Sequence, residues 1–154
     1  MDRSLDALYN SRILRLATQI PFTERLENPD VTVSRTSRIC GSRLTLDAQF
    51  DGPRIARLGL EVRACALGQA TTALVAPRLV GSTCEDIAPA ARAFAAMIRE
   101  GGPVPAPPWD DLEIFLPVRD HPSRHGSVML IFDAALAAFA AHGTRDRASG
   151  SETG

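Results

Sequence analysis

The sequence lacks the features that mark a nucleic-acid-binding protein. It contains no lysine: its 17 basic residues are all arginine, and 18 acidic residues are interleaved with them to give a formal net charge of −1. A near-neutral chain without a basic run does not present the positive surface that attracts a polyanion. We therefore expect no nucleic-acid partner and assign most of the charged residues to solvated faces.

Long apolar runs and a cysteine framework are also missing. No uninterrupted apolar run approaches the roughly 20 residues that cross a bilayer. Residues 1–4 open an amphipathic segment that has no secretory apolar core. The three cysteines form an odd set without disulfide spacing. We expect no membrane association, a cytoplasmic location, and free thiols available for metal or redox chemistry.

Aromatic residues are scarce, at 5% of the chain against 45% for all apolar residues. This composition predicts a core of Leu, Val, Ile and Ala in which helices pack closely. A chain of 154 residues is long enough for one domain. We place this domain at residues 1–143 and expect the polar, small-residue segment 144–154 to be a disordered tail.

What the sequence does contain is a clear strand periodicity in its first half. Apolar and polar side chains alternate in three segments, which is typical of strands with one buried face. Asp51-Gly52-Pro53 separates the second segment from the third and predicts a hairpin turn. The third segment drifts out of phase near Ala56 and Arg57, which indicates a bulge. The predicted strands are residues 31–39, 44–50 and 55–62.

Helical periodicity occupies most of the remaining chain. Ser4 is the expected N-cap of the first helix, and Ser82 or Thr83 that of the third. Pro117 is expected to end the fourth, short helix. The predicted helices are residues 5–17, 65–80, 83–98, 109–116 and 128–142. Together the segments predict an α+β fold, a three-stranded antiparallel sheet packed against helices on one face.

Two cysteines stand at the ends of the strand region. Cys40 precedes the second strand, and Cys65 lies where strand periodicity gives way to a helix, whose N-terminus favours the thiolate. Thiolates are the ligands that zinc and iron–sulfur centres prefer. The alternative is that each cysteine is a small buried hydrophobic residue, as intracellular cysteines often are. Cys84, in a cap region, fits a structural or exposed thiol better than a ligand.

The residues around both cysteines, and the order of the elements, resemble the IscU, SufU and NifU N-terminal family of iron–sulfur cluster assembly scaffolds. The resemblance covers residues 5–142. Its most specific parts are Cys40-Gly41 ahead of a strand, and residues 64–70, Ala-Cys-Ala-Leu-Gly-Gln-Ala, which are similar to the Gly-Cys helix start of the family. The resemblance implies a SufE/IscU-like fold and the binding of a transient iron–sulfur cluster, of iron or of zinc.

The sequence departs from the family pattern at two positions. Ser42 stands where the family has an aspartate, and Ser127 stands where it has a third cysteine before the last helix. A protonated serine hydroxyl binds zinc or iron poorly, so two of the four expected donors are weakened. The candidate metal-facing residues are Cys40, Cys65, His125, Ser42 and Ser127, with His121 beside them.

Three consequences of these departures are open. His125 or His121 rebuilds the site, since imidazole is a good zinc and iron ligand. Alternatively, Cys40 and Cys65 hold a cluster only across a dimer or together with a partner. In the third case the chain has kept the fold but no longer assembles clusters, and serves as a binding or regulatory relative. Both histidines also fit ordinary loop residues near a helix start.

The function that the resemblance implies is that of a scaffold and not of an enzyme. Such a protein receives sulfur from a cysteine desulfurase and passes its product to cluster-recipient proteins, as a monomer or homodimer. One alternative is a non-assembling domain that binds a desulfurase or has a regulatory role, and another is sulfur relay through a persulfide on Cys40 or Cys65. No Gly-x-Ser-x-Gly elbow surrounds Ser42 or Ser127, so hydrolysis is not favoured.

Overall fold

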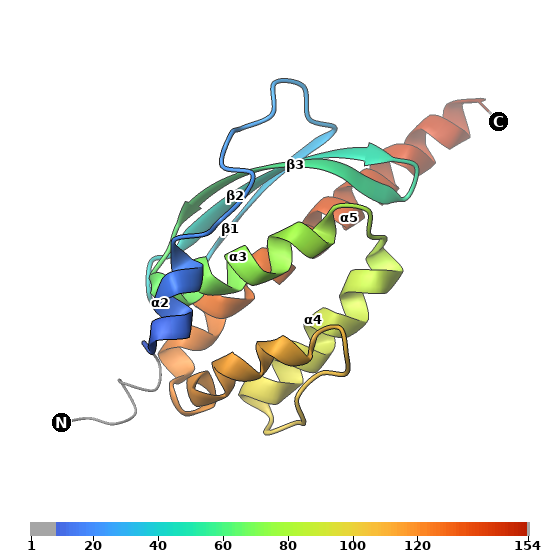
Figure 1. The fold of residues 1–154 in the computed structure, drawn as a ribbon. Helices are drawn as coiled ribbons and strands as arrows, with labels where there is room; N and C mark the ends of the chain where they lie inside the picture. Colours follow the sequence, from blue (N-terminus) through green and yellow to red (C-terminus); the bar gives the residue numbers. More distant parts are fainter. Residues whose placement is uncertain (1–8, 154) are drawn as a thin grey trace.

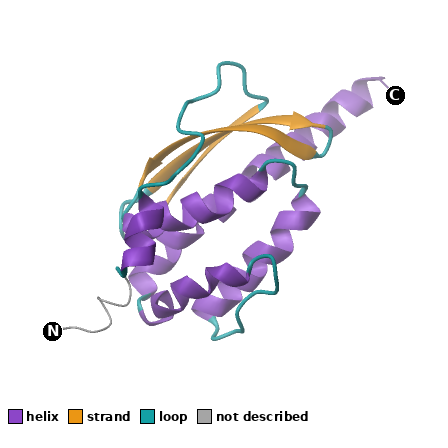
Figure 2. Cartoon of the chain, viewed as in Figure 1, coloured by secondary structure: helices purple, strands orange, loops and turns teal. Residues whose placement is uncertain are grey.

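The computed structural model describes residues 9–153, with side chains to residue 143. A sheet lies on one side of the molecule and the helices lie on the other (Figure 1). Loops connect the elements at both ends (Figure 2). The elements are α2 (Ser11–Ala17), β1 (Val31–Thr36), β2 (Arg43–Asp51), β3 (Arg54–Arg63), α3 (Ala66–Leu79), α4 (Cys84–Arg99), η1 (Asp110–Asp120), η2 (Pro122–Arg124) and α5 (His125–Thr153).

The sheet has the strand order β1-β2-β3, and both neighbouring pairs are antiparallel. The predicted hairpin turn joins β2 to β3. Gln49 pairs with Arg57 and Phe50 pairs with Ile55, so Ala56 is the extra residue of a bulge. The predicted α+β class, three-stranded sheet and bulge are confirmed.

The inner face of the sheet carries the apolar half of the strand alternation. Leu44 and Leu46 of β2 and Leu60 of β3 are fully or almost fully buried. Helix α5 packs against β1 and β2, α3 packs against α5, and α4 with η1 forms a further layer on the far side of α5 (Figure 1). Because the helices of the described residues lie beyond the inner face, these residues share one continuous core.

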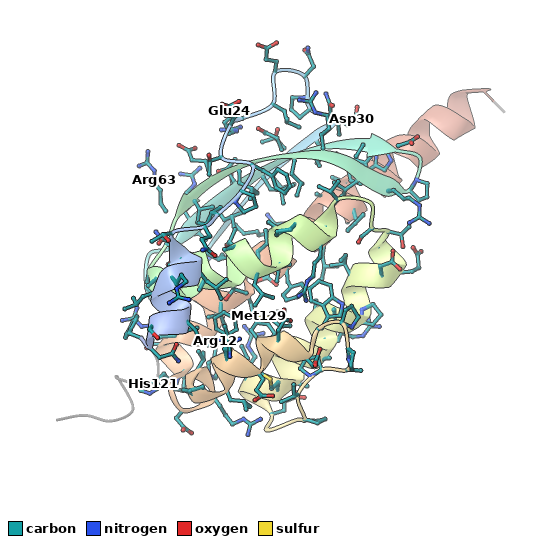
Figure 3. All side chains as sticks on the ribbon, in the orientation of Figure 1. Arg12, Glu24, Asp30, Arg63, His121 and Met129 are labelled. Carbon is teal, nitrogen blue, oxygen red and sulfur yellow. The ribbon has the colours of Figure 1, made fainter. Side chains whose placement is uncertain are left out.

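A long loop covers half of the outer face. It connects α2 to β1, and Glu24 and Asp30 mark its course above the sheet (Figure 3). Asp47 of β2 is fully buried beneath it and accepts hydrogen bonds from Arg25 Nε at 2.6 Å, the Leu26 N–H at 3.1 Å and the Thr32 hydroxyl at 2.6 Å. The sheet end near residues 36, 43 and 63 is left uncovered.

Several element boundaries differ from their predicted positions. β1 ends at Thr36, before the predicted limit at residue 39. In the predicted helix 5–17, the described residues Tyr9 and Asn10 are not helical, and α2 begins at Ser11, capped by Asn10. The Ser4 cap lies outside the described residues. Thr83 and Asp86 form a capping box at the start of α4, so Thr83 is the cap there.

Pro117 does not end the helix that contains it, so that prediction is wrong. The segment Asp110–Asp120 is a 3-10 helix that continues through Pro117. The proline ring fixes φ near −65°, which suits both 3-10 and α-helices, and prolines also lie inside α3 (Pro77) and α4 (Pro89), so a proline need not end a helix in this fold.

The last helix is longer than its predicted span. It begins at His125 and continues to Thr153, past the point where a disordered tail was expected, so the division at residue 143 stays a prediction. Within the described residues, Pro122–Gly143 is long and apolar enough to cross a membrane, with a mean hydropathy of 1.5. Polar residues interrupt this segment, so the sequence shows no uninterrupted apolar run there. More than half of the segment is buried against the sheet and helices, as in the core helix of a globular domain.

Candidate functional site

Cys40 is presented by a short closed loop between β1 and β2. The Ser37 N–H donates to the Ser42 carbonyl and the Gly41 N–H donates to the Ser37 carbonyl, both at 2.8 Å. Gly41 has a φ of +74°, a left-handed conformation that glycine adopts without strain. The two bonds fix the position of the Cys40 thiol at one end of the sheet.

Cys65 is the N-cap residue of α3, and its side chain makes no cap hydrogen bond to the helix. Its sulfur instead lies 3.3 Å from the hydroxyl oxygen of Ser127, in the first turn of α5. A Cβ placed on Gly68 of α3 would lie 2.6 Å from that hydroxyl. The small residues at the start of α3 therefore permit the approach that brings Ser127 to Cys65.

Five side chains from three parts of the chain form what we call the thiol–hydroxyl network. Cys40 Sγ lies 3.2 Å from both Ser37 Oγ and Ser42 Oγ, and Ser42 Oγ lies 3.1 Å from Ser127 Oγ, which contacts Cys65. Both inner serines, Ser42 and Ser127, are buried, while the two cysteines are partly exposed. The network thus joins two accessible thiols through a buried pair of hydroxyls.

The network changes the acidity of Cys40. Partial burial raises the pKa of its thiol, but hydrogen bonds with Ser37, with the Ser42 hydroxyl and backbone, and with Ser127 outweigh it and lower the pKa from 9.0 to about 7. Hydrogen bonds that stabilise the ionised form have this effect. Close to half of the Cys40 side chains are therefore thiolates at neutral pH, the form that attacks electrophiles and binds metals.

The histidines are placed differently from the cysteines. His125 Nε2 lies 2.9 Å from the Val118 carbonyl and 3.3 Å from that of Arg119, which ties its ring to the end of η1. His121 Nε2 is buried and has no hydrogen-bond partner among the described residues. No group of three or more His, Cys, Asp or Glu side chains able to hold a metal occurs in residues 9–143.

Four of the five predicted site residues are brought together, namely Cys40, Ser42, Ser127 and Cys65. Their role in metal binding stays a prediction, as does that of His125. Ser37 was not predicted as a site residue, although its position three residues before Cys40 and directly after a strand is what allows the loop to close over the thiol.

The donors in the network do not form a closed zinc site. A structural zinc takes four nitrogen, sulfur or oxygen donors in a tetrahedron, and a serine hydroxyl ionises too weakly to replace a thiolate or carboxylate. Within the described part of the chain, the network supplies two thiols and three hydroxyls. These residues can supply half of the four thiolates that a two-iron cluster binds.

Solved structures provide two informative similarities. The N-terminal part of a nitrogen-fixing NifU-like protein from Brucella abortus is 35% identical, with a TM-score of 0.83, covering 88% of this chain and 94% of that one. A putative iron–sulfur cluster assembly scaffold protein for the SUF system from Fervidobacterium islandicum AW-1 is 22% identical, with a TM-score of 0.79, covering 87% and 98%. The second similarity shows the fold alone. The sequence matches no protein-family model and no curated protein.

Proposed function

The chain belongs to the family of NifU-like N-terminal domains, and we propose that it acts in iron–sulfur cluster assembly as a scaffold-like protein. Its cargo is a nascent cluster, held through Cys40 and Cys65. The partners are a cysteine desulfurase that supplies sulfur and a recipient protein that takes the product. The proposed location is the cytoplasm, where the thiols stay reduced.

The observation that carries this proposal is the convergence of the two thiols. Residues 25 positions apart in sequence are linked through two hydroxyls at one end of the fold, with Ser42 and Ser127 between them. Both sulfurs are partly exposed, so a cluster can form on them and leave again. A cysteine with only a structural role needs neither a second thiol nearby nor partial exposure to solvent.

The number of donors defines how such cargo is held. One chain offers two converging thiols, whereas a two-iron cluster takes four cysteine ligands. We therefore propose that the cluster is shared between Cys40 and Cys65 of one chain and two further ligands from a second copy or a recipient protein. The hydroxyls of Ser42 and Ser127 then orient the thiolates and are not metal ligands.

Sulfur relay is a second candidate, and the lowered pKa of Cys40 favours it. The Cys40 thiolate attacks the outer sulfur of a persulfide on the donor protein. A new S–S bond forms on Cys40, the S–S bond of the donor breaks, and the donor cysteine leaves as a thiolate, without net oxidation. The Ser37 and Ser42 hydroxyls can donate to the persulfide anion. A third role, binding a desulfurase without assembly, needs no thiol.

The metal and sulfide content of the chain distinguishes these functions. Anaerobic incubation with ferric iron and sulfide is expected to give about one iron per chain, as one two-iron cluster for each pair of chains. Cys40→Ser and Cys65→Ser should each abolish it. Cys84→Ser is the matched control and should retain it, because Cys84 lies outside the network.

Three other results would change the conclusion. Iron retained in both the Cys40→Ser and Cys65→Ser variants would overturn the proposed ligands. Wild-type protein that is folded yet binds no iron, either alone or with the recipient protein present, would overturn the scaffold role. A persulfide on Cys40 in that iron-free protein, detected by mass spectrometry after incubation with a desulfurase and cysteine, would establish sulfur relay instead.

A further inference from the structure

An exposed apolar side chain lies next to the reactive thiol. Ile39 is 76% exposed, more than any other large hydrophobic residue of the described chain. Its neighbour Cys40 is only partly exposed. A single exposed apolar side chain is ordinary on a protein surface, so any docking role depends on the charged residues at the same end of the sheet.

Three arginines lie at the same end of the sheet as the loop that carries Ile39 and Cys40. Arg43 and Arg63 pair directly across β2 and β3 on the outer face, and Arg38 precedes Ile39. Like charges placed opposite each other destabilise a sheet. Among the described residues Arg38 and Arg43 have no ion pair, and Arg63 has only a 3.8 Å contact with Glu61. We call Arg38, Ile39, Arg43 and Arg63 the thiol rim.

The rim borders a hollow on the uncovered part of the sheet. The hollow measures about 340 Å³ and is lined by Gly41, Arg43, Thr45, Glu61 and Arg63. Glu61 is its single acidic residue, and this carboxylate is shared between Arg63 and Arg25, at 3.8 and 3.6 Å. The Arg63 side chain extends outward from the sheet, away from the helices (Figure 3). The hollow therefore has a net positive charge and faces solvent.

We infer that the thiol rim docks an acidic surface of the cysteine desulfurase that delivers sulfur to Cys40. Carboxylates of that partner pair with Arg38, Arg43 and Arg63, and an apolar socket receives Ile39. This inference rests on the proposed function, because a partner must reach Cys40 to exchange anything with it. Charge complementarity of this kind raises the association rate and fixes orientation.

The chemistry of the rim favours a protein over a nucleic acid. Its centre is an aliphatic side chain, and none of its four residues is aromatic, so it offers no platform on which bases could stack. The chain as a whole carries a formal net charge of −1, which disfavours a long polyanion. A group of arginines near an exposed aliphatic side chain instead matches the mixed polar and apolar character of a protein interface.

The test measures binding to the cysteine desulfurase of the same organism, by biolayer interferometry at low and high salt. Arg43→Glu and Arg63→Glu are each expected to slow association about tenfold at low salt, with a smaller effect at high salt. Arg57→Glu is the matched control, since Arg57 lies on the same outer face of β3, six residues away. Ile39→Ser should speed dissociation, whereas Val80→Ser, at the far end of α3, should not.

Each outcome has a distinct meaning. Loss of association in the two rim variants and not in Arg57→Glu supports the inference. Equal binding by all variants would overturn the docking role of the thiol rim and leave the proposed function intact. A wild-type chain that does not bind the desulfurase removes both the rim and the sulfur-donor partner. Binding of a single-stranded oligonucleotide as tight as that of the desulfurase would show a general anion site and would also overturn the inference.

Discussion

The Cys40 thiol has one hydrogen to donate and two serine oxygens at 3.2 Å from its sulfur. In the thiol form it can satisfy only one of them. In the thiolate form the hydroxyl hydrogens can rotate toward the sulfur, so Ser37 and Ser42 both donate. The network therefore favours the thiolate, because ionisation increases the number of hydrogen bonds that the sulfur makes.

This preference for the thiolate makes the reactivity of Cys40 dependent on pH. The rate of its alkylation by iodoacetamide, followed by peptide-resolved mass spectrometry, should rise with pH and reach half of its maximum near pH 7. Ser37→Ala and Ser42→Ala remove donors to the thiolate, so each should move the midpoint toward 9, the ordinary value for cysteine. Ser34→Ala is the control: its hydroxyl bonds to Thr45 outside the network. A midpoint that stays near 7 in both network variants would contradict the mechanism.

At the scale of elements, the loop before β1 is attached to the sheet through one buried carboxylate. The buried carboxylate of Asp47 needs hydrogen-bond donors, because an unpaired buried charge is costly. Arg25, Leu26 and Thr32 supply these donors. Gly59 makes the attachment possible, because a Cβ there would lie 2.7 Å from the Glu24 carbonyl oxygen. The loop thus needs both a buried acid on β2 and a glycine on β3.

Asp47→Asn should destabilise the protein by about 2 kcal/mol, because it removes the charge that holds Arg25 and leaves an amide group facing the Leu26 N–H. Glu61→Gln is the control, since Glu61 is half-exposed and its 3.6 Å contact with Arg25 should contribute less than about 1 kcal/mol. Urea denaturation at pH 7 measures both. Equal effects of the two substitutions would show that the buried contacts do not hold the loop.

The same carboxylate predicts the direction of acid sensitivity. Burial raises the pKa of Asp47, but the bonds from Arg25, Thr32 and Leu26 outweigh it and leave the pKa below its usual 3.8. The stabilisation is therefore complete above pH 4 and is lost as the pH falls through the lower folded-state value. The stability difference between wild type and Asp47→Asn should shrink over that acidic range.

The sequence supported some elements better than others for physical reasons. The strands, the hairpin and the bulge at Ala56 follow from a side-chain period of two, which a sequence displays directly. The continuation of η1 through Pro117 could not be predicted from the rule that proline ends a helix, because prolines also lie inside α3 and α4 of this fold. The contact of Ser127 with Cys65 depends on how closely α3 approaches α5, and only the resemblance to a family indicated it.

At the scale of the whole molecule, the proposed function implies that Ser42 and Ser127 decide how many chains are needed to hold a metal. The double substitution Ser42→Asp and Ser127→Cys gives one chain three thiols and a carboxylate in the positions of the network. That set fits a tetrahedral zinc. We expect the variant to bind about one zinc per chain as a monomer, while the wild type binds far less.

Elemental analysis after dialysis, combined with sedimentation, measures this change. Zinc should also raise the melting temperature of the variant, since a ligand that binds only the folded state stabilises it. Adding Cys65→Ser to the double variant is the control and should return zinc to the wild-type level. Equal zinc content in the wild type and the double variant would show that the serines do not limit metal binding.

Ser127 also determines when the site is completed during synthesis. It lies 85 residues after Ser42 and 62 after Cys65, so it is synthesised after both cysteines. Both cysteines therefore emerge from the ribosome well before the hydroxyl that joins them. A growing chain carries two separate thiols, and the paired site forms only once α5 has docked on the sheet. Under the proposed function, a chain in which α5 has not yet docked would present no paired site to a sulfur donor.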